Sequence, residues 1–312
     1  MRLTWCMSLA SAFQFRPEAC DRVRGFLGPA NSSLRAHEGP SCKYLPFAEN
    51  NFSLPSLIYR HIPKAGSSTA QMLLWKLWTH VVEHAAARPP PAVASIDGNL
   101  RRGALRIDLV VNCADPQLDA ARRAGAIEFA IVREPYERFV SGYYFTGENL
   151  LASGEDGGLD RLAEYLSENR YAMADGNVHH FPQVFFLCHC GQSTARRRRP
   201  PCARSVRHVL QLEHLSDHFF GFADQLFAGT AIPRMPREIP GPGSGEHKMQ
   251  NVGANSFASF AAMWASIAAG SSIAELLCAF LRADYTILAN YTRPAFCGGG
   301  RIEPGAYDTS GK

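Results

Sequence analysis

Residues Leu57 to Trp78, LIYRHIPKAGSSTAQMLLWKLW, change character twice along their length. The first three, Leu57–Tyr59, are apolar or aromatic and lie between two prolines, which predicts a short buried strand. The small residues Ala65–Ser68 predict a turn, and apolar residues then recur at helical spacing as far as Val81. The predicted order is therefore strand, turn and helix.

This order is suited to binding an anion. The first backbone N–H groups of a helix lack partners within the helix, and the partial positive charge at that end favours a negative ligand. Gly66 permits close approach of the backbone, and Lys64 adds a full positive charge. Hydroxyl donors follow at Ser67, Ser68 and Thr69. We expect a phosphate group to bind here.

A nucleoside-triphosphate loop is disfavoured. That loop has the pattern G-x-x-x-x-G-K-[ST], in which the lysine follows both glycines. Here Lys64 precedes Gly66, and the first glycine of the pattern is missing. A magnesium-dependent phosphotransferase is therefore the weaker of the nucleotide-based hypotheses.

Residues 61–69, HIPKAGSST, resemble the 5′-phosphosulfate-binding loop of the Golgi carbohydrate sulfotransferases, among them the heparan and uronyl 2-O and the chondroitin and dermatan types. These enzymes use 3′-phosphoadenosine 5′-phosphosulfate (PAPS) as donor. The resemblance implies donor contacts from seven consecutive residues: Pro63, Lys64, Ala65, Gly66, Ser67, Ser68 and Thr69.

A second motif follows another predicted strand, Ile127–Val132. Pro135 is placed to begin a helix, so Arg133 would stand at the end of the strand and Ser141 on the helix. The pattern R-x-P-x-x-R-x-x-S-x-Y from Arg133 to Tyr143 resembles the 3′-phosphate-binding motif of the same family. The resemblance implies that Arg133 and Ser141 hold the 3′-phosphate, for which a guanidinium and a hydroxyl are chemically suited.

The remaining chain extends this alternation, with a strand predicted over Leu105–Cys113 and a short helix over Pro116–Ala124. Further elements predicted are a strand at Val206–Leu215 and helices at Ser216–Phe227, Ser256–Ala269 and Ser272–Leu281. We predict an α/β, P-loop-like sulfotransferase fold, with a mainly parallel central sheet flanked by helices and the ligand at the C-terminal edge of the strands.

The predicted domain organisation has three parts. Residues 1–55 are expected to form a signal- or stem-like or irregular segment, residues 56–295 the sulfotransferase domain, and residues 296–312 a C-terminal tail. Late in the domain, four residues resemble family elements that follow the strand of residues 206–215 or close the domain: Glu213, Asp284, Tyr285 and Tyr291.

The expected reaction is sulfuryl transfer to a hydroxyl group, with Lys64 stabilising the negative charge that grows on the leaving phosphate. The motifs contain no pair of metal-binding carboxylates, so no metal is expected. His179 and His180, in a segment resembling one near the acceptor, are the first candidates for the general base. The alternatives are Asp108 between the two motifs and His80 or His84 on the first helix.

A glycan acceptor follows from the resemblance, and the mild net charge of +4 permits an acidic polysaccharide. The run Arg196–Arg199 is either a solvated charged tract or a patch for such a glycan, and nucleic acid is not expected because no aromatic residues interleave it. Relatives carry histidines between the two motifs, whereas Ile107–Cys113 has none. A catalytically silent glycan- or nucleotide-binding relative is therefore the alternative.

Nine cysteines and three N-x-[ST] sequons favour an oxidising, lumenal setting, and the resemblance implies the Golgi. For Cys188, Cys190 and Cys202, a disulfide closing the intervening loop is a more economical interpretation than a zinc site with His189. Residues Met1–Ala12 are either a short secretory signal or an ordered segment. Relatives have a membrane anchor, but no run of eighteen apolar residues occurs here, so membrane association stays open.

Overall fold

The structure is a computed structural model that describes residues 20, 41–84, 111–113, 115–142, 162–164, 166–167, 179, 181–188, 206–237, 267 and 270–299. The strands described form one sheet in the order β3-β1-β2-β4-β5. Their bounds are β1 Ser41–Leu45, β2 Leu57–Arg60, β3 Val111–Asn112, β4 Ile127–Val132 and β5 Val206–Gln211. β2, β4 and β5 are parallel, and β1 runs antiparallel to both of its neighbours. The predicted α/β fold with a mainly parallel sheet is confirmed.

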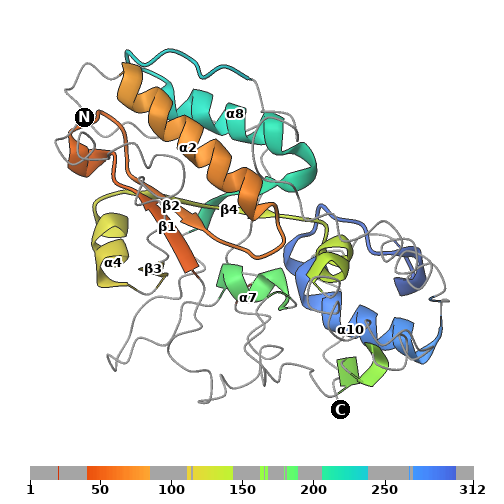
Figure 1. The fold of residues 1–312 in the computed structure, drawn as a ribbon. Coiled ribbons are helices and arrows are strands. Elements are labelled where there is room, and N and C mark those ends of the chain that lie inside the picture. The colour runs from red at the N-terminus through yellow and green to blue at the C-terminus, as the bar shows by residue number, and fades with distance from the viewer. Residues whose placement is uncertain are drawn as a thin grey trace, which may run out of the picture.

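Helices cover both faces of the sheet (Figure 1). Their bounds are α2 Ser67–His84, α4 Pro116–Arg123, α7 Gln183–Cys188, α8 Leu215–Phe227 and α10 Ser272–Ile287, and residues 135–142 are also helical. α2 and α8 lie side by side over one face, and α4 and α7 lie on the other (Figure 1). Three-residue 3₁₀ turns are η1 Ala48–Asn50, η4 Leu212–His214 and η5 Ala295–Cys297.

The sheet is buried on both faces, as expected for central parallel strands. Tyr59 and Phe129 pack into the core beneath α2 and α8. Ala130 and Val132 face the opposite core, to which α7 and α10 contribute. Alternation of side chains along β4 therefore fixes the sheet between two helical layers.

The expectation of an irregular segment up to residue 55 was wrong for its last part. Strand β1 lies within it and pairs with β2 over Cys42↔Arg60 to Leu45↔Leu57. Phe47 then packs against the ring of Trp78 on α2, with ring centroids 5.3 Å apart. Lys43 in the middle of β1 obscured the strand in the sequence, yet it is only 4% exposed.

Several predicted boundaries shift. The strand predicted over Val206–Leu215 ends at Gln211, where the turn η4 begins, and α10 extends past the predicted end at Leu281. Helix α4 matches its prediction, with Pro116 at its first turn and Asp115 accepting a hydrogen bond from the Gln117 N–H at 2.7 Å. The predicted helix Ser256–Ala269 lies almost wholly outside the described residues, as do residues 105–110.

Three disulfides are present among the described residues: Cys20–Cys188, Cys42–Cys113 and Cys278–Cys297. Cys188 therefore does not close a loop with Cys202, because its partner is Cys20. Cys190 and Cys202 lie outside the described residues. Disulfides as such were predicted, but sequence spacing could not give their pairing.

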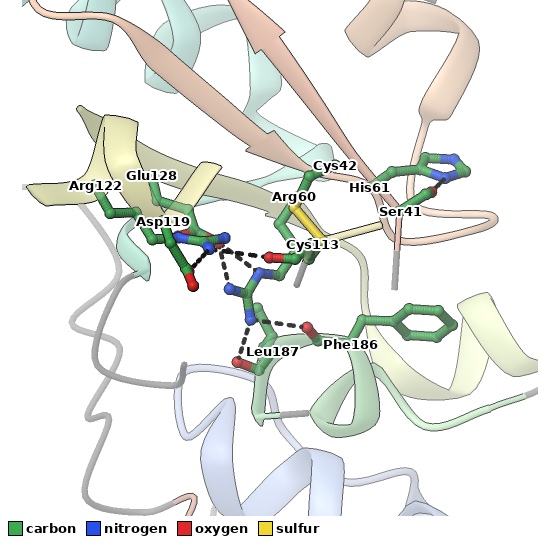
Figure 2. Close-up of a disulfide and its surroundings, with 10 residues drawn as sticks. All are labelled: Ser41, Cys42, Arg60, His61, Cys113, Asp119, Arg122, Glu128, Phe186 and Leu187. Carbon is green, nitrogen blue, oxygen red and sulfur yellow. Dashed lines mark hydrogen bonds and ion pairs between the residues drawn. A yellow bond between two sulfur atoms is a disulfide. The ribbon is translucent and has the colours of Figure 1, made fainter. Parts of the chain in front are cut away.

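A buried ionic cluster joins the sheet to α7 (Figure 2). Arg60 on β2 is fully buried and is paired with Glu128 on β4, which also accepts a hydrogen bond from Arg122 Nε at 2.8 Å. Nη1 of Arg60 donates to the carbonyls of Phe186 and Leu187 at 3.2 and 2.9 Å. The guanidinium thus satisfies the carbonyls at the C-terminal end of α7 and holds that helix against the sheet.

Candidate active site

The two predicted phosphate motifs lie next to each other. β2 and β4 are adjacent parallel strands, paired through Arg60↔Ala130, so their C-terminal ends open at the same edge of the sheet. β2 leads into the loop of Lys64 and β4 leads to Arg133. Arg138, on the helix of residues 135–142, donates from Nε to the carbonyl of Pro63 at 2.9 Å. This buried hydrogen bond links the two motifs directly.

The first loop requires its glycine. Gly66 has φ +77°, a conformation that L side chains rarely adopt, and a Cβ added there would lie 2.4 Å from Cδ1 of Leu212 on η4. Lys64 also lies in the left-handed region, with φ 63°. These two residues with left-handed backbone conformation turn the chain from β2 into α2, which begins at Ser67. The first N–H groups of this eighteen-residue helix, which have no partners within the helix, therefore lie at the edge of the sheet where β2 ends.

The rest of the predicted loop lies where the sequence placed it. Pro63 and Ala65 are buried beneath the loop, and Thr69 is half-buried in the first turn of α2. Ser68 also lies in this first turn. The seven residues predicted to contact the donor are therefore continuous along the loop and the first turn of α2, with Pro63 and Ala65 buried.

Lys64 is half-buried, and its environment weakens its hold on the proton. Burial lowers the pKa of its ammonium from 10.5 to about 8. The side chain therefore remains mostly cationic at neutral pH. The negative charge of a bound anion would offset the hydration that the ammonium loses on burial.

The second loop is positioned through its backbone by Gln183, the first residue of α7. Its amide oxygen accepts from the Arg133 N–H at 2.9 Å, and its amide nitrogen donates to the Arg133 carbonyl at 2.6 Å. The Arg133 guanidinium is 28% exposed and contacts Glu137 at 3.3 Å. Ser141 is half-buried on the same helix, as predicted. Arg133 thus has a fixed backbone and a side chain open to solvent.

Gln183 is itself held by the C-terminal helix α10. Both oxygens of Asp284 accept backbone N–H groups at the start of α7, from Gln183 at 2.9 Å and Val184 at 2.7 Å. The carboxyl is buried, and burial raises its pKa to about 6. A chain of contacts therefore runs from α10 through α7 to the backbone of Arg133.

Two glutamates beside Arg133 join the same C-terminal region. Glu134 accepts a hydrogen bond from the Tyr285 hydroxyl, and its own N–H donates to Glu213 at 2.7 Å. The Tyr291 hydroxyl donates to the other oxygen of Glu213 at 2.8 Å. Burial raises the pKa of Glu134. The late residues picked out by resemblance therefore support the loop that carries Arg133.

Of the two histidines predicted as general base, the described one lies near the lysine. His179 is half-buried in a turn before α7. Burial, followed by the charges of Lys64 and Arg138, lowers its pKa and so favours the neutral ring that a base requires. His180 lies outside the described residues, as does the alternative base Asp108.

The histidines on α2 do not reach this region. His80 Nε2 is 2.8 Å from the Pro233 carbonyl, and His84 Nδ1 is 2.9 Å from the His80 carbonyl. Thirteen residues separate His80 from Ser67 in the helix, which corresponds to about 20 Å along its axis. The two histidines were alternatives only on the condition that this part of α2 faces the site, and the contacts of His80 with Pro233 and Phe227 give that condition no support.

Three supporting residues were not assigned roles from the sequence. Gln183 was visible only as a member of the segment after His179 and His180 that resembles one near the acceptor, and Arg138 only as the second arginine of its motif. His61 precedes Lys64 closely, and its contacts depend on Ser41 in β1, a strand that was not predicted. In the described ranges, no group of three or more His, Cys, Asp or Glu side chains could hold a metal ion, and no helix is long and apolar enough to cross a membrane.

The structure thus has a strand-to-helix loop at the N-terminus of α2 beside an arginine at the end of the next strand, an arrangement that is chemically suited to anionic groups. The profile of the sulfotransferase family matches residues 54–219, which is more than half of the chain and includes both motifs. The chain therefore belongs to the sulfotransferase family. No curated protein and no solved structure matches it.

Proposed function

We propose that the protein transfers a sulfuryl group from PAPS to a hydroxyl group of a carbohydrate. Membership of the sulfotransferase family supports the reaction type. The observation that supports PAPS is the placement of two anion-binding motifs at neighbouring strand ends, joined by the bond from Arg138 to Pro63. PAPS carries a 5′-phosphosulfate and a 3′-phosphate on one nucleoside, so it requires two such sites close together.

The residues present fit such a donor. The 5′-phosphosulfate would bind the N–H groups and hydroxyls at the start of α2, where Lys64 adds positive charge. Gly66 supports this loop by allowing its left-handed turn and its close packing against Leu212. The 3′-phosphate would bind Arg133 with Ser141. Glu137 contacts Arg133 at an exposed position, so a phosphate dianion can replace that carboxylate as the partner of the guanidinium.

Bound PAPS would supply an activated sulfuryl group whose leaving group is a phosphate. Lys64 would stabilise the negative charge that develops on the bridging oxygen, assisted by donors fixed at the helix N-terminus. Because these donors are held by the fold before any ligand binds, little reorganisation is needed. His179, kept neutral by burial and by the charge of Lys64, would accept the proton of the attacking hydroxyl.

The carbohydrate acceptor rests on the resemblance of both motifs to those of the Golgi carbohydrate sulfotransferases. Three disulfides among the described residues support an oxidising compartment such as the secretory pathway, since disulfides persist there. We therefore propose a Golgi or other secretory location, with glycans as acceptors. An acidic polysaccharide is the natural candidate within that class.

The test is transfer of radiolabelled sulfate from PAPS to a panel of neutral and acidic glycans. Lys64→Ala should abolish transfer with the fold intact, and Arg133→Ala should chiefly raise the KM for PAPS. Matched controls are Lys76→Ala, farther along α2, and Arg123→Ala at the exposed end of α4. Unchanged turnover in both site variants would contradict the proposal.

Two other results would support a different function for the protein. Binding of 3′,5′-adenosine bisphosphate without transfer to any glycan would support the catalytically silent relative. Thermal stabilisation by ATP and magnesium, with none by the bisphosphate, would support a phosphotransferase.

A further inference from the structure

His61 links β1, β2 and the start of α2. Its backbone N–H donates to the Ser41 carbonyl at 2.9 Å. Its ring nitrogens lie at hydrogen-bonding distance from two serine hydroxyls, with Nδ1 3.0 Å from Ser41 Oγ and Nε2 2.7 Å from Ser67 Oγ. Ser67 is the first residue of α2 and one of the proposed donor contacts. The ring therefore connects the proposed phosphosulfate loop to the neighbouring strand.

The direction of these bonds follows from the hydrogen atoms available. Ser67 Oγ also lies 3.4 Å from the Ile62 carbonyl, which can only accept. If the single hydroxyl hydrogen of Ser67 points to that carbonyl, the hydrogen between Ser67 and His61 must come from Nε2. Nδ1 of a neutral ring must then accept a hydrogen from the Ser41 hydroxyl. In this arrangement the Ser67 hydrogen is not used by the histidine.

A neutral ring is the form that the surroundings favour. Burial lowers the pKa of His61 to about 4, with further contributions from the positive charges of Lys43 and Arg138. A charged ring would donate from both nitrogens and could not accept from Ser41. The neutral ring with a hydrogen on Nε2 is thus consistent with every contact.

We propose that His61 is a positioning residue that donates from Nε2 to Ser67, so that the Ser67 hydroxyl keeps its hydrogen for the 5′-phosphosulfate of the donor. On ligand binding, this hydrogen turns from the long contact with the Ile62 carbonyl to the anion. This inference rests on the proposed function, because it requires an anionic donor at the start of α2. It assigns a role to a residue that does not itself touch the reacting atoms.

The two ring nitrogens can be tested separately by amide substitutions. Glutamine places its amide near the position of Nε2, whereas asparagine places it near Nδ1. His61→Gln should therefore keep the bond to Ser67, and His61→Asn should keep only the bond to Ser41. The product that PAPS leaves after sulfuryl transfer is 3′,5′-adenosine bisphosphate. Its affinity, measured by calorimetry, should fall about tenfold in His61→Asn and less than about threefold in His61→Gln.

A double-mutant cycle separates this role from a structural one. Ser67→Ala should lose about tenfold in affinity, and adding His61→Asn to it should cause no further loss. In the transfer assay, His61→Asn should raise the KM for PAPS and leave the KM for the acceptor unchanged. Should His61→Asn fail to fold, the same comparison is made between His61→Gln and Ser67→Ala, whose affinities should differ by more than about threefold.

Three outcomes would overturn the inference. If wild-type protein binds the bisphosphate and His61→Asn binds it equally well, the positioning role fails while the proposed function stands. Independent losses from His61→Asn and Ser67→Ala would likewise refute a shared hydrogen bond. If the wild-type protein binds no bisphosphate at all, the proposed function fails and this inference fails with it.

Discussion

Gly66→Ala tests the geometry of the first loop through its stability. The added Cβ would lie 2.4 Å from Leu212 Cδ1, where carbon atoms in ordinary contact are about 3.5–4.0 Å apart. The φ of +77° adds a separate cost, because a residue with a Cβ is disfavoured in the left-handed region. The contact can be relieved only if the Leu212 side chain, which packs against the core beneath α2 and α8, changes its conformation.

The expected loss follows from these two contributions. The left-handed conformation costs about 1–2 kcal/mol, and overpacking costs about 1–3 kcal/mol. Replacing glycine restricts the unfolded chain and returns about 0.4–1 kcal/mol. We therefore expect Gly66→Ala to lower the free energy of unfolding by about 1–5 kcal/mol.

The assay is urea unfolding of Gly66→Ala, Leu212→Ala and the double variant. Truncating Leu212 removes the atom nearest to the new Cβ, so the double variant should be more stable than the sum of the single losses predicts, by about 1–3 kcal/mol. Gly125→Ala is the matched control, because Gly125 has φ +97° with nothing within 4 Å of an added Cβ. It should show only the backbone cost. Additive losses at Gly66 and Leu212, or equal losses at the two glycines, would refute the close approach.

Three further predictions concern charge. The kcat/KM for PAPS should fall as pH rises through about 8, because Lys64, with its pKa lowered to that value, loses the charge that stabilises the leaving phosphate; a profile flat to pH 10 would refute this. Burial raises the pKa of Asp284 to about 6 in the folded state, whereas the unfolded state releases this proton near 3.8. The free energy of unfolding should therefore decrease as the pH rises from about 4 to 6, and Asp284→Asn should abolish that decrease in urea unfolding at pH 4, 5 and 6. Arg60→Met should cost about 3–5 kcal/mol of unfolding free energy by leaving buried Glu128 without one partner, whereas Arg123→Met at an exposed position should change it by less than about 0.5 kcal/mol; equal stabilities would contradict the importance of the buried pair.

The donor motifs could be predicted because each is encoded locally. The residues of β2, its turn and α2 are continuous in sequence, as are β4 and the helix carrying Arg133 and Ser141. The carboxyl ends of parallel strands open at a common edge, so both strand-to-helix junctions were expected at the same edge of the sheet. The pairing of Arg60 with Ala130 agrees with that expectation.

The supporting contacts could not be predicted in the same way, because they join distant segments. Gln183 contacts Arg133 across fifty residues, and Asp284 caps α7 across about a hundred. Glutamine and aspartate are also common at exposed positions, so the residue types of Gln183 and Asp284 alone do not indicate these contacts. Strand β1 was missed for a different reason: a buried lysine interrupts its apolar pattern. Because β1 was not predicted, the contact between His61 and Ser41 on that strand could not be predicted either.

The central claim is that two anion sites at one sheet edge bind the two ends of a single nucleotide. Calorimetry of wild-type protein and Arg133→Ala with 3′,5′-adenosine bisphosphate and with 5′-AMP tests it most directly. The account predicts that Arg133→Ala weakens the bisphosphate until it binds no better than 5′-AMP, while the affinity for 5′-AMP itself is unchanged. Equal loss for both ligands, or for neither, would contradict the assignment of Arg133 to a separate 3′-phosphate site.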